Sequence, residues 1–499
     1  MAQAAEDRSY LTKDEEKEMV DKVNQLLLAG QPVPGSKLRI LAFEIKSMRP
    51  DLDEQILPPG PNWEYGFMRE NRSFIVQKAV PDLAVTPLDA EDLCSQCVTI
   101  RRNLDKLQVD HKWEARRLHR FRKIPTEVSQ ISCKLCHFLR ACLTSWGVGL
   151  VTEHCLFVYH MEHAFGSAVA GTGGLLGLSA ENSSRMDSVY GWIIPRSLGD
   201  FNDGNNDNEA LQVDLQPSFQ AEKAKTWLDF CDKNHSIHCE MATDDCIPHL
   251  RLINTSTNDT SIAWATPGSK YAALSYVWGD VAESLSERPK KLPKTIPLVV
   301  RDALKVAREL GIPYLWVDRY CVDQDEKSSI KLEQLENMHR VYQSAYVTII
   351  AGAGEDPSLG LPGVSVRKRE RQLFVDIYGS RLLAIPNVVH DINGCKWSTR
   401  GWVYQENLFS RRRLVFTETQ MYFQCLSMNC CEAVPNLLEE AHTKDLQRFE
   451  SHLDTYMVFP RNSIGIGTTG IELVARIQPY VARNFGREKD ALIAFLGIF

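Results

Sequence analysis

Several features that would narrow the function at once are absent from this sequence of 499 residues. No apolar run approaches the roughly 18 residues of a membrane-spanning helix. The N-terminus lacks the positive and apolar regions of a secretory signal. Neither a Walker phosphate loop nor an HExxH motif occurs. We therefore expect a cytoplasmic protein without a membrane span.

A strong charge of either sign is also lacking, because 57 basic residues face 64 acidic ones and the net charge is -7. Such mild acidity gives no electrostatic case for a nucleic-acid partner. The basic stretch at 101–123 carries no aromatic platform, which favours a solvated helix face. With 44% hydrophobic and 24% charged residues, the composition is that of a folded globular protein.

The length predicts about three domains, and composition shifts divide the chain further. We expect an N-terminal helical or irregular segment at 1–85 and a cysteine-rich α+β region at 86–265. A central α/β domain follows at 266–435, and a helical segment at 436–499. The sequence stops on the apolar segment DALIAFLGIF. We expect the last segment to be truncated, because a natural terminus rarely ends on exposed apolar residues.

The sequence has 14 cysteines, which a reducing compartment keeps as thiols or metal ligands rather than disulfides. Two CxxC pairs are formed by Cys94, Cys97, Cys133 and Cys136. Paired thiolates of this kind build tetrahedral zinc sites, so we predict structural zinc here. Buried free thiols are the alternative, and His111 or His119 could replace one thiolate.

A second cysteine pattern lies in AEKAKTWLDFCDKNHSIHC, which is predicted to be helical. Cys231, His235 and Cys239 recur there at four-residue steps, on one side of a helix. With Cys246 nearby, these side chains could hold a metal. A helix face buried under the next domain explains the same spacing.

The rest of the chain is organised around residues 271–406, where three blocks alternate apolar strands with polar ends. The blocks are YAALSYVWGD (271–280), LWVDRYCVDQD (315–325) and STRGWVYQENL (398–408). Strands are predicted at 271–278, 314–322 and 346–354, with helices at 293–312 and 328–345 between them. This alternation predicts a parallel, doubly wound sheet, in which ligands bind where the strands end.

The patterns YxALSYxWG, LWxDxxCxxQ with a following MxxxYxxA, and RGWxxQE resemble the three blocks of the fungal heterokaryon-incompatibility (HET) domain. The resemblance covers about 270–435. It implies a role in non-self recognition and in the programmed death of incompatible fused cells. It also implies other incompatibility or death-pathway proteins as partners, with homo-oligomerisation left open.

The order and spacing of these blocks are also similar to the Toll/interleukin receptor (TIR) fold. That resemblance implies a TIR/flavodoxin-like parallel sheet flanked by helices. Ser275 and Tyr276 match the Ser-Tyr end of the first TIR strand, and Asp318 matches the end of the second. Trp402 and Glu406 match the WCxxEL block of a later helix.

Two departures from the TIR pattern are visible, because Val403 replaces its cysteine and residues 363–396 form an insertion before the glutamate. Some TIR domains hydrolyse NAD, and the matching glutamate is their catalytic residue. The resemblance therefore implies Glu406 as a candidate catalytic residue and NAD as a candidate substrate.

Cleavage of the nicotinamide–ribose bond passes through an oxocarbenium-like state, which an adjacent carboxylate stabilises. The candidate nucleotide-binding residues are Ser275, Trp278, Gly279, Asp318, Gln324, Arg400 and Trp402. The tryptophans offer aromatic faces to the base, and the Arg400 guanidinium suits a pyrophosphate.

Each of these residues also has a structural interpretation. Glu406 could interact with the dipole at a helix start or pair with Arg400, Asp318 could cap a turn, and the tryptophans could belong to the core. Cys321 has no neighbouring histidine in these blocks to activate it as a nucleophile. The segment GIGTTG (465–470) matches GxGxxG but lacks a preceding strand. A non-catalytic module that self-associates or binds a partner thus remains the alternative function.

Overall fold

The computed structural model describes the chain in segments, and the statements below concern these alone. The described residues are 11–28, 35–48, 67, 93–104, 116–121, 133–146, 148, 154–160, 174–180, 189–197, 215–240, 247–255, 261–279, 289–325, 327–377, 380–433, 438–449, 457–459, 477, 479–484 and 494. The expectations for His111, Cys246, the GIGTTG segment and, apart from Ala494, the final apolar residues lie outside them.

The chain divides into two compact units. The N-terminal unit comprises residues 1–164, 171–209 and 372–394, and the C-terminal unit comprises 165–170, 210–371 and 395–499. The four regions expected from the sequence are segments that would fold independently. This division into four stays a prediction.

Helices α2 (Lys13–Leu28) and α3 (Gly35–Ser47) of the N-terminal unit share a small core that includes Met19, Val23 and Ala42. A capping box starts α2, because Thr12 N donates to Glu15 Oε2 at 2.7 Å and Glu15 N donates back to Thr12 Oγ1 at 3.3 Å. Both helices lie within the segment at 1–85 that was expected to be helical or irregular.

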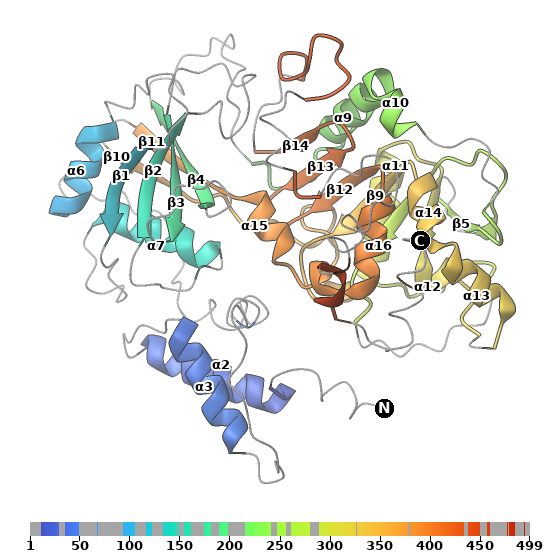
Figure 1. The fold of residues 1–499 in the computed structure, drawn as a ribbon, viewed down its shortest axis with the longest axis horizontal. Coiled ribbons are helices and arrows are strands. Elements are labelled where there is room, and N and C mark those ends of the chain that lie inside the picture. Colours follow the sequence, from blue (N-terminus) through green and yellow to red (C-terminus); the bar gives the residue numbers. More distant parts are fainter. Residues whose placement is uncertain are drawn as a thin grey trace. The chain divides into compact units, whose positions relative to one another are not determined.

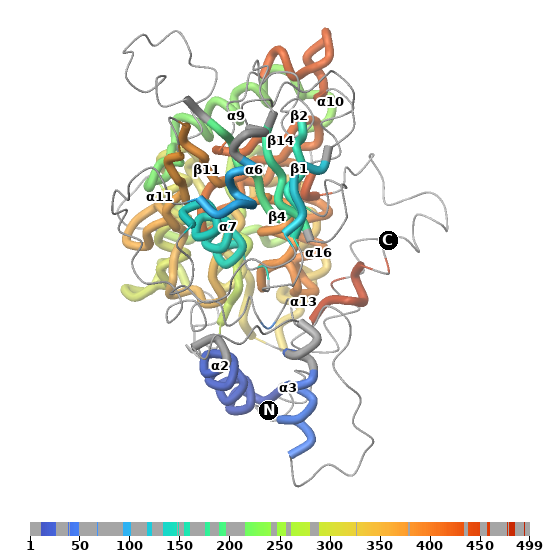
Figure 2. Tube along the Cα trace, turned by 90° about the vertical axis from the view of Figure 1, so that its left-hand side faces the viewer, coloured from blue at the N-terminus to red at the C-terminus, as the bar shows by residue number. Residues whose placement is uncertain are grey.

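The remaining part of the N-terminal unit is built on a six-stranded antiparallel sheet (Figure 2). Its strands, in spatial order, are β1 (Arg116–Phe121), β2 (His154–His160), β3 (Gly174–Ala180), β4 (Val189–Ser197), β11 (Ser380–Pro386) and β10 (Phe374–Ile377). Helices α6 (Ser95–Leu104) and α7 (Lys134–Ser145) share its apolar core. Gly191 lets β4 approach Trp146, since a Cβ there would lie 2.5 Å from the indole.

The insertion at 363–396 has a defined role in this sheet. Its hairpin β10–β11 pairs with β4 through β11, in register from Ser380 opposite Ser197 to Pro386 opposite Gly191. Helix α15 (Val388–Asn393) follows it. A segment that interrupts the central motif in sequence thus completes the sheet of the other unit.

The C-terminal unit contains an eight-stranded sheet, drawn in Figure 1 from green to orange. Its strands, in spatial order, are β14 (Asn429–Cys431), β13 (Met421–Cys425), β12 (Arg412–Phe416), β9 (Val347–Ala351), β7 (Tyr271–Ser275), β8 (Tyr314–Val317), β5 (Arg251–Asn254) and β6 (Ile262–Trp264). The four central strands are parallel, and antiparallel strands extend both edges. The predicted parallel sheet is therefore confirmed for its centre, and the fold class is mixed α/β.

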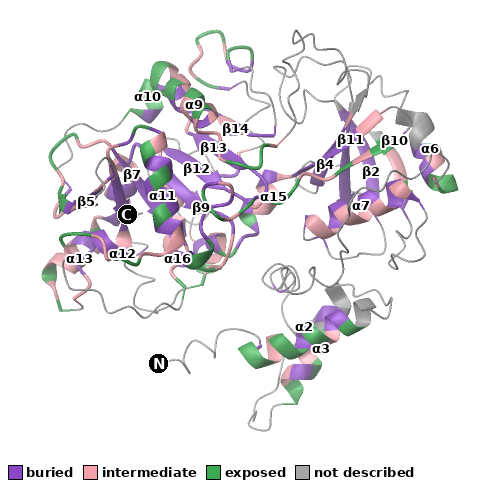
Figure 3. Ribbon diagram, turned by 180° about the vertical axis from the view of Figure 1, so that it is seen from behind, coloured by how far each residue is buried: buried purple, intermediate pink, exposed green. Residues whose placement is uncertain are grey.

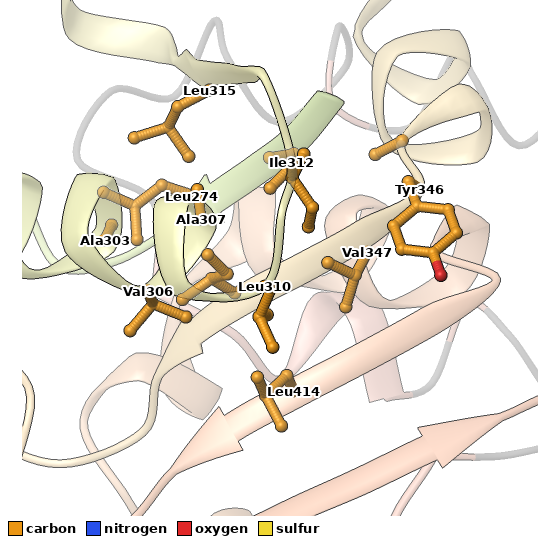
Figure 4. Close-up of a cluster of buried hydrophobic side chains, with 14 of the residues drawn as sticks. Leu274, Ala303, Val306, Ala307, Leu310, Ile312, Leu315, Tyr346, Val347 and Leu414 are labelled. Atoms are coloured by element: carbon orange, nitrogen blue, oxygen red, sulfur yellow. The ribbon is translucent and has the colours of Figure 1, made fainter. Parts of the chain in front are cut away.

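Helix α11 (Leu298–Glu309) packs on one face of this sheet, where Ala303, Val306 and Ala307 lie over Leu274 and Leu315 (Figure 4). Its buried and exposed residues alternate with helical period in Figure 3. The stop predicted at Gly311 is present, because its φ of +71° is the left-handed conformation of a helix end.

The opposite face carries the helix α14 (Met338–Ser344). Side chains alternate along a strand, so Trp316 points away from the α11 face that its neighbour Leu315 contacts. Trp316 meets Tyr342 of α14 with ring centroids 5.5 Å apart. Ser275 lies on this same face, because it alternates with Leu274. The predicted doubly wound arrangement is thus present, with α16 (Gly401–Phe409) packed against α14.

Two predicted elements are subdivided. The helix predicted at 328–345 is α13 (Ser329–Glu336) and α14, separated at Asn337. The strand predicted at 314–322 ends at Val317, and the single turn α12 (Asp318–Cys321) follows it. This early end turns the polar residues after Val317 away from the strand ladder.

Candidate functional site

Polar side chains from three distant segments meet at the carboxyl ends of β7 and β8. Ser275 ends β7, Asp318 directly follows β8, and Glu406 lies on α16 with Arg400 at its N-cap. We call Ser275, Asp318, Arg400 and Glu406 the carboxyl cluster. The expected convergence of the motif ends is present, and the parallel strand order explains it, because parallel strands end at one edge.

The Glu406 carboxyl group is buried, with 7% of the residue exposed, and a directed chain of hydrogen bonds holds it. The indole Nε1 of Trp397 can only donate, and it donates to Ser275 Oγ at 2.6 Å. Ser275 therefore directs its hydroxyl hydrogen to Glu406 Oε2. The hydroxyl of Tyr342 is a further partner of the carboxyl group. The site thus fixes one orientation of Glu406.

Burial raises the pKa of Glu406 to about 7. The positive charge of Arg400 and the hydroxyls of Ser275 and Tyr342 lower this pKa, whereas the charge of Asp318 raises it. Burial disfavours the ionised carboxylate and outweighs the favourable neighbours. Glu406 therefore exchanges its proton near neutral pH, which is a property of catalytic carboxylates.

Asp318 is partly exposed and accepts two hydrogen bonds. Trp278 Nε1 donates to its Oδ2 at 2.7 Å, and Arg319 N donates to its Oδ1 at 2.7 Å. Burial still raises the pKa of Asp318 to about 6, although these donors and Arg400 lower it. The guanidinium of Arg319 lies over the Trp278 ring, 5.9 Å from its centroid. The first tryptophan of the motifs thus positions a carboxylate.

Arg400 connects the start of α16 to the end of β7. Its Nη1 donates to the carbonyl oxygen of Tyr276. Among the described residues the buried Tyr276 hydroxyl has no hydrogen-bond partner, and burial raises its pKa well above the ordinary value. The charge of Asp318 raises that pKa further and the charge of Arg400 lowers it, so the Tyr276 hydroxyl lies within reach of the carboxyl cluster's charges.

The four residues of the carboxyl cluster lie within one stretch that matches a known protein family. The family model described as "Heterokaryon incompatibility protein (HET)" matches residues 271–406, the stretch from the first residue of β7 to Glu406. This chain therefore contains a HET domain at residues 271–406.

Two curated proteins are similar to the chain. "Vegetative incompatibility protein HET-E-1" of Podospora anserina is 26% identical over 234 residues, which are 46% of this chain and 14% of that protein. "Heterokaryon incompatibility protein 6, OR allele" of Neurospora crassa is 28% identical over 134 residues, which are 22% of this chain and 19% of that protein. The chain therefore matches less than a fifth of either relative's length. No solved structure matches.

Three predicted nucleotide-binding residues of the HET domain have evident structural contacts. Gly279 has a φ of +67°, and a Cβ there would lie 2.7 Å from Pro357 Cδ. Gln324 Nε2 donates to the carbonyl oxygens of Val322 at 3.0 Å and Arg319 at 3.2 Å, which closes the turn after β8. Trp402 is partly buried and packs against the apolar core. Their binding roles stay predictions.

Helix position and burial decide two interpretations of the HET blocks, namely a dipole contact for Glu406 and a nucleophilic role for Cys321. Glu406 is the sixth residue of α16, beyond the first turn where the helix dipole favours a carboxylate. Cys321 is fully buried, and burial raises its pKa to about 12, which leaves the thiol protonated and unreactive. The dipole therefore does not explain Glu406, and Cys321 has none of the character of a nucleophile.

Sequence reasoning missed Trp397 and Tyr342 as contributors to the cluster. Tyr342 is the tyrosine of the MxxxYxxA pattern, to which the sequence assigned no role in the site. Trp397 directly precedes the third block, in KWSTRGW. The aromatic residues flanking the motifs were the available signal, but only the fold shows that both reach Ser275 or Glu406.

The four cysteines of the two CxxC pairs converge in the N-terminal unit. Each pair lies at a helix start, since α6 begins after Cys94 and α7 begins after Cys133. All four sulfur atoms lie within 4.8 Å of one another, with Cys136 Sγ 3.5 Å from Cys97 Sγ and 3.7 Å from Cys94 Sγ. Hydrogen bonds from Cys136 and Cys97 lower the pKa of Cys133. This arrangement could hold a metal ion without a histidine.

No helix among the described residues is both long and apolar enough to cross a bilayer.

Proposed function

We propose that this protein acts in heterokaryon incompatibility, because its two curated relatives are named as a vegetative incompatibility protein and a heterokaryon incompatibility protein. In this proposal the HET domain drives the death of incompatible fused cells after non-self recognition. It acts in the cytoplasm together with other incompatibility or death-pathway proteins. The support is the match of residues 271–406 to the HET family.

The proposed chemistry is hydrolysis of NAD at the nicotinamide–ribose bond, as in some TIR domains. The spatial order β8, β7, β9, β12 of the parallel strands supports the TIR resemblance. It corresponds to the 2-1-3-4 order of flavodoxin-like sheets, which bind ligands at the carboxyl ends of the strands. The carboxyl cluster occupies that edge.

Glu406 would stabilise the positive charge that develops on the ribose as nicotinamide leaves. Arg400 would bind the pyrophosphate, and the partly exposed Trp278 would contact a ring of the substrate. The observation that carries this proposal is the buried Glu406 carboxyl group, with its pKa of about 7, beside Ser275 and Asp318. A buried carboxyl group that titrates at neutral pH lowers the stability of the folded protein, which favours a functional over a purely structural role.

The direct test compares nicotinamide release from NAD by the purified full chain with that by Glu406→Gln. We expect a loss of at least about 100-fold, which is typical when one charge-stabilising group is removed. Glu309→Gln is the control, because Glu309 is a partly exposed carboxylate at the end of α11, on the opposite face of the sheet. Equal, background-level release by all three proteins would refute the enzymatic proposal.

The second candidate is a non-catalytic module that acts by self-association or partner binding. It is favoured by the 7% exposure of Glu406 and by the internal positions of its hydroxyl partners. In a cell-death assay, this alternative predicts that Glu406→Gln still kills. Light scattering on the purified protein would then show an oligomer that the variant retains. Loss of killing together with loss of NAD consumption would reject this alternative.

We also propose structural zinc at the four N-terminal cysteines. A zinc–sulfur bond of about 2.3 Å gives sulfur–sulfur distances of about 3.8 Å in a tetrahedron, and the observed separations of 3.5 and 3.7 Å are close to this value. Metal analysis should find about one equivalent that is lost in Cys133→Ser. Unchanged metal content in that variant would reject the site.

A further inference from the structure

A separate group of three buried thiols lies in the C-terminal unit. Cys231 comes from α9 (Ala221–Asn234), Cys239 from the short helix α10 (Ser236–Cys239) and Cys425 from the end of β13. Each residue is 0% exposed, and the three sulfur atoms all lie within 4.8 Å of one another. We call these residues the thiol cluster. The single helix predicted over Cys231, His235 and Cys239 is divided at His235 into α9 and α10, and the third sulfur comes from a strand far along the chain.

His235 presents a lone pair to this cluster. A chain of hydrogen bonds through His442 fixes its tautomer. His442 Nδ1 lies at hydrogen-bonding distance from the carbonyl oxygen of Leu438, which can only accept, so Nδ1 carries the hydrogen. In the neutral imidazole the other ring nitrogen, Nε2, is then an acceptor.

That acceptor lies 3.1 Å from His235 Nε2. His235 must therefore carry its hydrogen on Nε2, and in the neutral ring its Nδ1 has a free lone pair. This Nδ1 lies 3.4 Å from Cys425 Sγ. Metal-binding histidines usually donate their second ring N–H to a fixed partner, which is the arrangement that His442 provides.

Hydrogen-bond donors point at two of the three sulfur atoms. The backbone N–H groups of Ser427 and Met428 both donate to Cys425 Sγ at 3.3 Å. Arg412 Nε donates to Cys231 Sγ at 3.1 Å, and Arg412 itself is 3% exposed. A zinc ion with three thiolates and one neutral imidazole has a net charge of -1. The Arg412 guanidinium, which also pairs with Asp232 at 2.7 Å, would offset part of that charge.

We infer that Cys231, Cys239 and Cys425 bind a structural zinc ion, with His235 Nδ1 as the fourth ligand. Three sulfurs and one nitrogen form one of the recurrent ligand sets of closed zinc sites. The ion would bind the α9–α10 segment to the turn between β13 and β14. It would thereby fix the antiparallel edge of the eight-stranded sheet to the helices preceding the HET domain.

Metal analysis of the full-length protein tests this site. We expect Cys425→Ser to contain about one equivalent of zinc less than the wild type. Cys430→Ser is the matched control, because Cys430 is 1% exposed on the adjacent strand β14 and lies outside the thiol cluster. A zinc content of Cys425→Ser equal to that of the control would overturn the inference.

Cys133→Ser provides a second test that leaves the thiol cluster intact. If the inference holds, this variant retains about one equivalent of zinc, whatever the N-terminal cysteines bind. After replacement of that ion by Co²⁺, the absorption spectrum should show sulfur-to-metal charge transfer that changes in His235→Gln. A Cys133→Ser protein that folds without any bound metal would refute the second site, even if Cys425→Ser cannot be purified.

Discussion

Two buried glutamates of the C-terminal unit, Glu406 and Glu432, are held in contrasting ways. Glu432 is 4% exposed, forms an ion pair with Arg369 at 2.9 Å and accepts a hydrogen bond from Met421 N at 2.9 Å. Glu406 is 7% exposed, and its hydrogen-bond partners among the described residues are the neutral hydroxyls of Ser275 and Tyr342. One carboxylate has a buried counterion in direct contact, whereas the other has hydroxyls.

This difference distinguishes a carboxylate that is buried for stability from a carboxyl group that is buried for its chemistry. A buried carboxylate that is paired contributes to a folded arrangement whose loss would leave an isolated charge. A buried carboxyl group whose pKa is raised by burial destabilises the folded protein at neutral pH. Such a group is retained when its chemistry is needed, which is why Glu406 rather than Glu432 is the candidate catalytic residue.

The largest expected effect on stability comes from replacing the paired residue, Glu432. Glu432→Gln removes the counterion of the buried Arg369 guanidinium, and breaking such a pair costs about 3–5 kcal/mol. Urea unfolding should therefore show a large loss of stability at every pH between 6 and 8. A loss below about 1 kcal/mol would show that Glu432 is not a structural carboxylate and would remove one side of the comparison.

Glu406→Gln should have the opposite sign. The folded protein holds the Glu406 proton more tightly than the unfolded chain, because the pKa rises from 4.5 to about 7 on folding. This contribution favours the folded state below about pH 4.5 and is lost as the pH rises through 7. At pH 8 the neutral glutamine should therefore stabilise the protein by about 2–3 kcal/mol.

At pH 4 the difference between wild type and Glu406→Gln should disappear, because the wild-type carboxyl group is then protonated. The pH dependence of the unfolding midpoint measures this. Destabilisation of Glu406→Gln at pH 8 would place Glu406 in the same class as Glu432.

Asp318→Asn should change stability by less than about 1 kcal/mol at pH 8, because two effects offset each other. The neutral side chain removes the penalty that raises the pKa of Asp318 to about 6. It also loses one of two hydrogen bonds, since an amide cannot accept from both Trp278 Nε1 and Arg319 N. A change above about 2 kcal/mol in either direction, measured by urea unfolding, would contradict this balance.

Arg400→Met should have the smallest and most specific effect. The charge of Arg400 lowers the pKa of Glu406, so its removal should raise that pKa further. NAD cleavage requires the ionised carboxylate, and its pH profile should shift upwards by about one pH unit. The pH profile of kcat/KM measures the shift, with Lys396→Met on the same loop as control. A weaker activity with an unshifted profile would assign Arg400 a binding role alone.

Local signals predicted much of the central fold. The alternation of apolar runs predicted β7, α11, β8 and β9, and Gly311 predicted the end of α11. The breaks within the predicted elements were missed, because α12 and the interruption at Asn337 involve residues that are compatible with either conformation. The antiparallel strands at the sheet edges were missed because their partners lie far away in the sequence.

The candidate sites show the same limit. Both CxxC pairs were readable because each pair lies within one helical turn, and the structure brings the pairs together. Cys425 carried no such signal, since the chemistry that it shares with Cys231 depends on tertiary contact alone. The hairpin β10–β11 likewise gave no sign that an insertion in the HET motif pairs with β4. Spacing predicts local groups, and long-range pairing requires the fold.

The titration of the Glu406 carboxyl group tests the central claim most directly. In full-length protein labelled with [δ-¹³C]glutamate, the Glu406 resonance is the one that disappears in Glu406→Gln. Its chemical shift should titrate with a midpoint near 7, as expected for a carboxyl group kept buried for chemistry. A midpoint at or below the ordinary value of 4.5 would contradict the account, because Glu406 would then be a stably ionised structural residue.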